Sequence, residues 1–247
     1  MTTISRIEWT EQTWNPAVGC TKISAGCKNC YAETMAKRLK AMGMPGYANG
    51  FALQILPERL GDPLKRKKPT VYFVNSMSDL FHERIPDIYV EQVFDVIYRT
   101  PHHTYQILTK RAARMARFFK SRAVPDNAWL GVSVENRRHG VPRIDYLRRV
   151  PAKIRFLSVE PLLEDVSALD LTRIHWVIVG GESGPKARPM KKEWADSVRA
   201  QCAEQNVAFF FKQWGGWGAD GKRRAKHANG RLLNGRTWDE MPAAASI

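Results

Sequence analysis

Residues 70–110 read TVYFVNSMSDLFHERIPDIYVEQVFDVIYRTPHHTYQILTK. A short apolar run stands at each end of this stretch, and apolar residues recur at helical spacing between them. Apolar runs of about four to six residues, bounded by polar residues and breakers, suit strands buried on both faces of a parallel sheet. The stretch therefore predicts a strand, a helix and a second strand. The residues predicted to share one helix face are Ile88, Val93, Val96 and Ile97.

The same pattern recurs along the rest of the chain. It predicts strands over 70–79, 104–110, 128–136, 153–161, 175–183 and 207–215. Their starts lie about 20 to 35 residues apart, which leaves room for a crossover helix each time. One such helix is predicted over 191–206, where Trp194, Val198 and Cys202 recur at helical spacing, so Cys202 is expected to be a buried core residue. Ahead of these units, residues 4–16 predict a less regular strand and residues 30–42 a helix.

Six or seven βα units in 247 residues predict an α/β fold, a partial (βα)6–7 TIM-type barrel with parallel strands. They are too few for a complete barrel of eight strands, and a doubly wound open sheet is the alternative. We expect a single domain over 1–247. Within it, residues 43–69 form an insertion rich in Gly, Pro and charge, and residues 216–247 form a basic C-terminal extension.

The chain carries an excess of positive charge. Lys and Arg number 39 against 24 Asp and Glu, which gives a formal net charge of +15. Such an excess favours nucleic acid as a partner, since neutralising phosphates releases counterions, although a generally basic surface that aids solubility is the alternative. No apolar run approaches the roughly 18 residues of a membrane span, and the N-terminus lacks the layout of a signal peptide. We therefore expect a cytoplasmic protein with no membrane partner.

Every predicted strand ends in polar residues. In parallel βα barrels the loops at the carboxyl ends of the strands build the functional face, so these residues are candidates by position. The carboxylates among them are costly to bury without ligands or pairing. For any one residue the alternative is a loop cap or a helix N-cap. The set comprises Asn75, Ser76, Ser78, Asp79, Thr109, Lys110, Ser133, Glu135, Asn136, Ser158, Glu160, Gly180, Gly181, Glu182, Ser183, Lys212, Gln213 and Trp214.

Three of the four cysteines lie close together, in the segment GCTKISAGCKNCYAE at 19–33. Cys20, Cys27 and Cys30 form a C-x6-C-x2-C pattern on a loop that leads into a predicted helix. A structural zinc site takes four ligands, and no second pair follows at ligand spacing. The candidates for a fourth ligand are His82, His102 and His103. A four-iron cluster held by three cysteines instead leaves one iron without a protein thiolate and able to bind another molecule.

Almost the whole chain resembles a phage- and bacterium-associated family of radical SAM-like proteins with the same three-cysteine motif. The resemblance rests on motifs that occur in order: IEWTEQTWNPAVGC, VNSMSDLF, ILTKR, GVSVEN, RFLSVEPLL, WVIVGGESGPKARPM and FFFKQWG. More distantly, the arrangement is similar to that of spore photoproduct lyase, which repairs a thymine lesion in DNA. Radical SAM enzymes usually carry C-x3-C-x2-C, so the first gap is three residues longer here. The glycine–glycine–glutamate motif that typically follows their second strand is replaced by NSMSD.

The resemblance implies an enzyme that cleaves S-adenosylmethionine reductively and abstracts hydrogen from its substrate. Cys20, Cys27 and Cys30 would ligate a [4Fe-4S] cluster in a loop at the N-terminal edge of the barrel, and Tyr31 would pack near the adenine. The residues implied for the methionine and ribose groups are Asn75, Ser76 and Asp79 (amino group), Lys110 (carboxylate), and Ser133, Glu135 and Asn136 (ribose or carboxylate). The residues placed only at the mouth are Glu160, Gly180, Gly181 and Glu182, assigned to the cofactor, and Lys212 and Trp214, assigned to the substrate.

The charge and three aromatic residues, Phe81, Trp214 and Trp217, favour a nucleic-acid base as substrate, although core and rim packing is the alternative for these rings. An electron donor such as a flavodoxin or ferredoxin would be a further partner. Two other functions stay open. One is a nucleic-acid-binding module that zinc or a cluster stabilises without catalysis. The other is a barrel hydrolase that uses the glutamates at the strand ends.

Overall fold

The computed structural model describes residues 3–5, 7–166 and 168–242. The chain falls into two compact units, each built from several segments. Unit 1 takes its described residues from Met1–Ile23, Cys30–Gly131 and Arg149–Lys153. Unit 2 takes its described residues from Ser24–Asn29, Val132–Arg148 and Ile154–Ile247. The first two cysteines of the motif therefore belong to different units, since Cys20 lies in unit 1 and Cys27 in unit 2.

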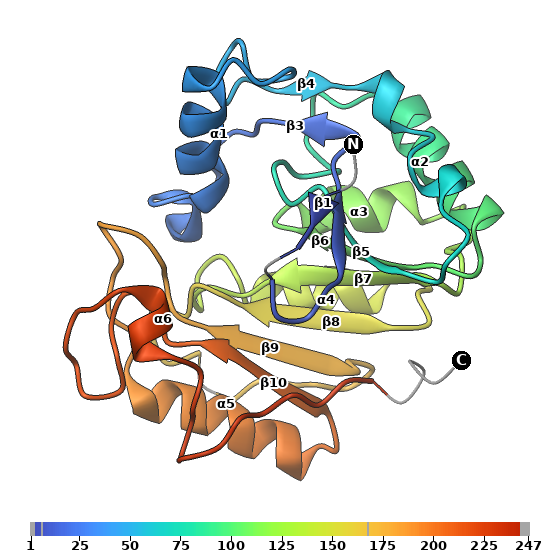
Figure 1. Cartoon of the computed structure of the whole chain (residues 1–247). Helices are drawn as coiled ribbons and strands as arrows, with labels where there is room; N and C mark the ends of the chain where they lie inside the picture. Colours follow the sequence, from blue (N-terminus) through green and yellow to red (C-terminus); the bar gives the residue numbers. More distant parts are fainter. Residues whose placement is uncertain (1–2, 6, 167, 243–247) are drawn as a thin grey trace. The chain divides into compact units, whose positions relative to one another are not determined.

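The strands follow one another in the sheet in the same order as in the chain, β1-β2-β5-β6-β7-β8-β9-β10 (Figure 1). Their bounds are β1 Thr3–Ile4, β2 Gln12–Trp14, β5 Val71–Val74, β6 Thr104–Thr109, β7 Ala128–Ser133, β8 Arg155–Val159, β9 Trp176–Gly180 and β10 Ala208–Gln213. β1 pairs with β2 antiparallel, whereas β2 with β5, β5 with β6, β8 with β9 and β9 with β10 are parallel. Sequential parallel strands have the topology of a TIM-type barrel, and seven of them make a partial one. A helix lies in each connection from β2 onward except the one between β8 and β9, where the described residues contain none. The predicted fold is confirmed, and the doubly wound alternative is wrong because the order of these strands never reverses.

All six strands predicted from residue 70 onward are present, but each is shorter than predicted. The first ends at Val74, five residues before the predicted end, because Asn75 adopts a positive φ of 57° that a strand does not accommodate. The apolar runs of β7, β8 and β9 are buried along their whole length, as predicted for strands covered on both faces. Most of the predicted strand-end residues therefore lie in loops. Those that belong to the strands themselves are Thr109, Ser133, Ser158, Gly180, Lys212 and Gln213.

Among its described residues, unit 1 contains the helices α1 Tyr31–Ala41, α2 Asp87–Arg99 and α3 Ala112–Phe118. On α2 the three later residues of the predicted apolar face are buried, but Ile88 is 62% exposed. Its predicted place is taken by the next residue, Tyr89, whose hydroxyl donates to the carbonyl of Pro16 at 2.7 Å. The prediction for Ile88 was wrong because the helix starts at Asp87, so that Ile88 lies in its first turn and the apolar face begins at Tyr89.

The insertion at 43–69 packs onto the cysteine segment within unit 1. Its strand β4, Gln54–Ile55, pairs antiparallel with β3, Ala17–Val18, which directly precedes Gly19 and Cys20. The remaining regular turns of the insertion are the 3-10 turns η2 Pro57–Arg59 and η3 Pro63–Lys65. The insertion is therefore part of the structure that positions the first cysteine.

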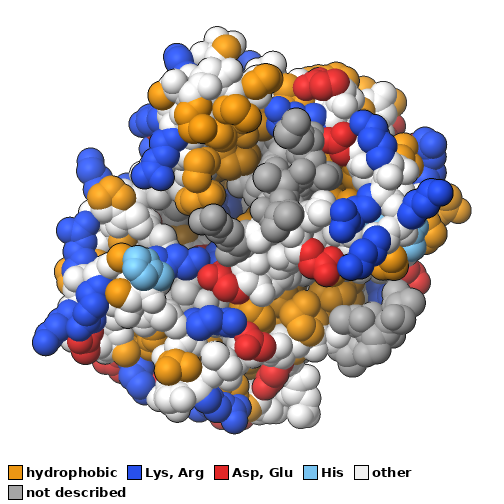
Figure 2. All heavy atoms as spheres, in the orientation of Figure 1, with side chains coloured by type: hydrophobic (Ala, Val, Ile, Leu, Met, Phe, Trp, Pro, Cys, Tyr) orange, Lys and Arg blue, Asp and Glu red, His pale blue; other side chains and the backbone are white. Residues whose placement is uncertain are grey.

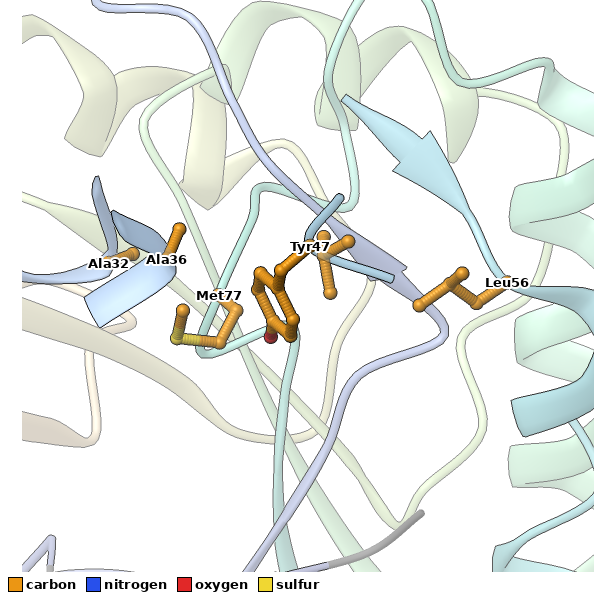
Figure 3. Close-up of a cluster of buried hydrophobic side chains, with 6 residues drawn as sticks. Ala32, Ala36, Tyr47, Leu56 and Met77 are labelled. Carbon is orange, nitrogen blue, oxygen red and sulfur yellow. The ribbon is translucent and has the colours of Figure 1, made fainter. Parts of the chain in front are cut away.

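A small apolar cluster joins this insertion to α1 (Figure 3). Tyr47 and Leu56 come from the insertion, Ala32 and Ala36 from the buried face of α1, and Met77 from the loop after β5. The side chain of Cys30 packs against the same cluster. The start of α1, and with it the third cysteine of the motif, is thus fixed by apolar burial rather than by a polar cap.

In unit 2 the helices are α4 Pro142–Arg148, α5 Lys192–Glu204 and α6 Lys226–Asn229, preceded by the 3-10 turn η1 Ala25–Cys27. Helix α5 lies along β9 and β10 (Figure 1). It buries Cys202 completely, and this burial raises the pKa of the thiol to about 12. The prediction of Cys202 as a core residue is confirmed. Over the described ranges, no helix has both the length and the apolar content to cross a membrane.

The last described segment of the chain covers β10, the final strand of the sheet. The N–H of Phe211 donates to the carbonyl of Trp238 at 2.9 Å, and the N–H of Glu240 donates to the carbonyl of Phe209 at 3.3 Å. The indole of Trp176 on β9 also donates to the carbonyl of Glu240, at 2.8 Å. This part of the basic extension therefore belongs to the packed body of unit 2.

Candidate functional site

The three cysteines of the motif are partly exposed, and none of them forms a disulfide. Cys20 follows β3, Cys27 ends η1 with its Sγ 3.7 Å from the hydroxyl of Ser24, and Cys30 directly precedes α1. Across the described ranges no three His, Cys, Asp or Glu side chains stand together as a metal site. Which metal group the motif suits is therefore judged from the type of its side chains. Three reduced, accessible thiols are the ligand set of iron–sulfur clusters.

The histidines considered as a fourth zinc ligand are engaged in other contacts of unit 1. Nε2 of His82 lies 2.9 Å from the hydroxyl of Thr21, and its Nδ1 accepts from a backbone N–H two residues on. Nε2 of His102 and Nε2 of His103 both contact the carbonyl of Arg66, at 3.1 and 3.0 Å. Each histidine thus fixes a loop, and the donor set fits a cluster better than a four-ligand zinc site.

Cys20 has a charged neighbour that the sequence patterns did not single out. Nη1 of Arg111 donates to Sγ of Cys20 at 3.4 Å and to Asp79 at 3.2 Å. Arg111 is buried, directly after Lys110 at the end of β6. The motif ILTKR contains it, but its contact with a cysteine 91 residues away has no periodic signal in the sequence.

The carboxylate of Asp79 is saturated with donors from unit 1. Besides Arg111, it accepts from the hydroxyl of Thr109 at 2.7 Å and from the backbone N–H groups of Phe81 and Lys110, both at 3.0 Å. These contacts tie the loop after β5 to the end of β6. Each oxygen of Asp79 already accepts two hydrogen bonds, so its role is to hold these two segments together.

The other polar residues after β5 hold the segment that precedes the cysteines. The hydroxyl of Ser76 donates to Asn15 at 3.2 Å, and that of Ser78 donates to the carbonyl of Ala17 at 2.8 Å. Asn75 is buried, and its Oδ1 accepts from the N–H of Ala17 at 3.4 Å. Its Nδ2 has no hydrogen-bond partner among the described residues. An amide N–H donates, so this group suits a ligand oxygen rather than an ammonium.

The strand ends of unit 2 carry three glutamates, and each is paired with a cation. Glu135, fully buried after β7, accepts from Nη1 and Nη2 of Arg143 on α4 at 2.6 and 3.3 Å. The same guanidinium donates to the carbonyl of Ser133 at 2.7 Å. Asn136 next to it caps the following turn, its Oδ1 accepting from the N–H of His139 at 2.9 Å. These residues close the loop between β7 and α4.

Glu160 and Lys212 form the second pair. Nζ of Lys212, on β10, lies 2.9 and 2.8 Å from the two carboxylate oxygens of Glu160, which follows β8. The amide of Gln213 also donates to Glu160, at 3.2 Å. Gly180 ends β9 beside this pair, and a Cβ there would lie 3.1 Å from the carboxylate carbon of Glu160. A lysine and a glutamate thus pair between β8 and β10, the two strands on either side of β9.

Gly181 lets two loops of unit 2 approach closely. A Cβ at this position would lie 2.0 Å from the carbonyl oxygen of Trp214, so no side chain fits. Trp214 itself is only 2% exposed, with its indole N–H donating to the carbonyl of Leu232 at 2.8 Å. Of the other two aromatic residues proposed for stacking, Phe81 is fully buried and Trp217 donates to the carbonyl of Ala187. The rings of Phe81 and Trp214 are core groups.

Glu182 forms the third pair, with Arg188 from the loop after β9. The guanidinium donates through Nε to Oε2 at 2.9 Å and through Nη2 to Oε1 at 2.5 Å, while Asn29 adds a bond to Oε2 at 2.9 Å. Burial by itself raises the pKa of Glu182, but the hydrogen bonds from Arg188 and Asn29 outweigh it and hold the pKa below its ordinary value. Asn29 lies two residues after Cys27, so this pair anchors the segment that carries the second cysteine within unit 2.

This arrangement predicts an acid-sensitive contribution to stability. Because the pKa of Glu182 is lower in the folded chain than in the unfolded one, the unfolded chain takes up a proton first as the pH falls. The contribution is complete above the ordinary carboxyl pKa of 4.5 and is lost as the pH falls through the lower, folded-state value. Denaturant unfolding between pH 3 and 7 should therefore show a shallower acid-side loss of stability for Glu182→Gln than for the wild type.

The matched control is Glu193→Gln, an exposed glutamate in the first turn of α5. Its acid-side slope is expected to equal that of the wild type. Equal slopes for Glu182→Gln and the wild type would show that the pairing of Glu182 does not contribute to stability.

Figure 2 shows how charge is spread over one face of the molecule. Lys and Arg side chains are dispersed over this face and interspersed with Asp and Glu, and they do not gather in one patch. On this face the basic charge is thus distributed. Tyr31, expected near the adenine, is 63% exposed at the start of α1.

The comparisons with known proteins agree with this fold. A sequence profile for the family described as "Protein of unknown function (DUF5131)" matches residues 4–242. No curated protein matches the chain. Among solved structures, a spore photoproduct lyase complexed with dinucleoside spore photoproduct matches with a TM-score of 0.50 at 13% identity, covering 83% of this chain and 64% of that chain.

Two further spore photoproduct lyase structures match over more of their length. A cysteine-to-alanine mutant of the lyase has a TM-score of 0.51 at 12% identity and is covered to 78%. A tyrosine-to-phenylalanine mutant has a TM-score of 0.52 at 11% identity and is covered to 79%. At such identities the likeness concerns the fold alone. The similarity to spore photoproduct lyase expected from the sequence is confirmed at that level, although this chain spans only 64% of the first of these lyase chains.

Proposed function

The chain belongs to the DUF5131 family, and from its fold and its cysteines we propose that it is a radical SAM-type iron–sulfur enzyme. The observation that carries the proposal is a combination. Three accessible cysteines without disulfides lie between β3 and the start of α1, at the N-terminal edge of a partial βα barrel. The radical SAM-like fold of the matched lyase structures supports the same assignment.

Cys20, Cys27 and Cys30 would hold a [4Fe-4S] cluster. When bound, such a cluster supplies one iron without a protein ligand and the electron for reductive cleavage of S-adenosylmethionine. Apolar packing against Cys30 and the contacts of Arg111 with Cys20 would hold two of the thiolates in place. The chain's own contribution is thus to orient the thiolates and to balance their negative charge.

The strand-end residues would bind S-adenosylmethionine with roles that differ in part from those predicted. The buried Nδ2 of Asn75 would donate to the methionine carboxylate, because it is a donor without a partner among the described residues. Asp79 would act through the residues it organises, since its oxygens are already occupied. Ser133, Glu135 and Asn136 would shape the site through the loop that they close with Arg143.

For the substrate we propose a nucleic-acid base, and the support is the net charge of +15. Phe81 and Trp214 were expected to stack on a base, but both rings are buried in the core and are not part of the support for this substrate. The activity of spore photoproduct lyase is not carried over as a whole, since this chain spans 64% of that protein. A single-electron donor such as a flavodoxin or ferredoxin would be the redox partner.

The decisive experiment measures S-adenosylmethionine cleavage directly. The chain is purified and reconstituted without oxygen, reduced with dithionite in the presence of S-adenosylmethionine, and analysed for 5′-deoxyadenosine by mass spectrometry. We expect product well above that of a protein-free control, and more of it if an added DNA or RNA oligonucleotide is a substrate. A chain with a full complement of iron and sulfide that forms no 5′-deoxyadenosine would contradict the proposal.

The two rival functions make different demands. A zinc-stabilised binding module would contain stoichiometric zinc and no sulfide, but the loop histidines that would complete its ligand set are engaged elsewhere. A glutamate hydrolase would need a carboxylate ready to act as an acid or base. Each of the three strand-end glutamates is instead held by a cation, which argues against that role.

A further inference from the structure

Arg111 uses every N–H of its guanidinium within unit 1. Nε donates to Glu83 at 3.0 Å, and Nη1 donates to Asp79 at 3.2 Å and to Sγ of Cys20 at 3.4 Å. Nη2 donates to the carbonyl of Thr21 at 3.2 Å and to its hydroxyl at 2.9 Å. One guanidinium thus contacts both Cys20 and the residue after it. The forked guanidinium therefore donates hydrogen bonds both to the backbone and to the side chains of the loop that begins the cysteine motif.

The orientation of Arg111 is fixed from the other side. Its backbone N–H donates to the hydroxyl of Thr109 at 2.8 Å, and that hydroxyl donates to Asp79 at 2.7 Å. The guanidinium itself is only 6% exposed. A buried, fully satisfied guanidinium has little freedom to reorient, because any turn would leave a donor or the Asp79 charge unpaired.

Cys20 is held by backbone contacts as well. Its N–H donates to the carbonyl of Phe51 at 3.2 Å. Gly19 before it has a φ of 79°, and a Cβ there would lie 2.1 Å from the carbonyl oxygen of Ala52. The main chain of the cysteine is therefore set by the insertion, and its side chain meets the guanidinium of Arg111.

We propose that Arg111 is the positioning residue for Cys20: it orients the Sγ and donates a charge-assisted hydrogen bond to the thiolate when that thiolate ligates the cluster. This inference rests on the proposed function and deepens it. Hydrogen bonds and positive charge at a ligand sulfur stabilise the reduced, more negative state of an iron–sulfur cluster and so raise its reduction potential. Loss of the Arg111 contact should therefore make the cluster harder to reduce.

The test is a potentiometric titration of the whole reconstituted chain. The EPR signal of the reduced cluster is measured at each potential, and it gives the midpoint potential. The double variant Asp79→Asn/Arg111→Gln removes the cation and keeps the buried charges balanced, and we expect a more negative midpoint potential than in the wild type. Arg111→Lys keeps the charge but loses the fork, so its midpoint should lie between the two. Thr21→Val removes one acceptor of the guanidinium without a change of charge and should give a smaller shift in the same direction.

The matched control is Arg122→Gln, which breaks an exposed ion pair with Glu91 elsewhere in unit 1 and should leave the midpoint unchanged. Variants that hold as much iron and sulfide as the wild type but share its midpoint would overturn the role of Arg111 while leaving the proposed function intact. A wild-type chain that takes up no iron and sulfide would instead overturn the proposed function, and with it the assignment of Arg111. Folded Arg111 variants that fail to take up the cluster would support the orienting part of the role.

Discussion

Replacing Cys27 by alanine is expected to abolish cluster binding and 5′-deoxyadenosine formation together. The variant would retain two cysteines of the motif. A four-iron cluster with only two thiolate ligands has a second iron without a protein ligand. The side chain of Cys27 is partly exposed and ends a short 3-10 turn, so its removal costs little packing. Iron and sulfide should fall to background while the circular dichroism spectrum and the unfolding midpoint stay close to those of the wild type.

Cys202→Ala is the matched control, because Cys202 is fully buried on the inner face of α5. It should lose some stability through the small cavity that it creates, and it should keep a full cluster and full activity. If Cys27→Ala still formed 5′-deoxyadenosine, the cleavage would not depend on a cluster held by this motif, and the proposed role of the three cysteines would be wrong. If both variants lost the cluster, general destabilisation would explain the loss.

Arg143→Met is expected to cause the largest loss of stability in unit 2. Glu135 has no exposed surface and accepts two bonds from this guanidinium, so the variant removes both of these charge-assisted bonds from a buried carboxylate. Breaking a buried pair from one side costs about 3–5 kcal/mol. Unfolding in urea at neutral pH should show this loss.

The double variant Glu135→Gln/Arg143→Met removes both charges and should recover much of the loss, since an uncharged pair is not penalised in the same way. Arg122→Met serves as the control, because its exposed pair with Glu91 contributes at most about 1 kcal/mol. Equal stability of Arg143→Met and the wild type would show that the pair of Arg143 with Glu135 does not contribute to stability.

The sequence allowed the strands, the helices and their order to be predicted because each depends on local periodicity. The run at 175–183, for example, becomes β9 with every residue buried. Strand ends depend on backbone conformation at single residues, and the positive φ of Asn75 has no signature in a hydrophobic pattern. The prediction for Ile88 was wrong for a related reason, because one turn of a helix offers two apolar neighbours and only packing selects between them.

The candidate site was predictable in its residues but not in their pairing. The carboxylates were expected to need partners, and the partners are Arg111, Arg143, Arg188 and Lys212. The paired positions lie 32, 8, 6 and 52 residues apart, so no single spacing identifies them. Trp214 follows a strand and was expected at the mouth. It is buried because its ring packs against Phe211, with the ring centroids 5.0 Å apart, and its indole N–H donates to the carbonyl of Leu232.

The segment that lies along β10 also bears on whether the chain associates with other copies of itself. β10 contains three consecutive phenylalanines and is the last strand of the sheet, and an uncovered strand of this kind is a template for pairing with other chains. Residues 238–240 occupy part of its hydrogen-bonding edge and shield it. A chain shortened before this segment would therefore self-associate through β10, and samples for the anaerobic experiments should retain it.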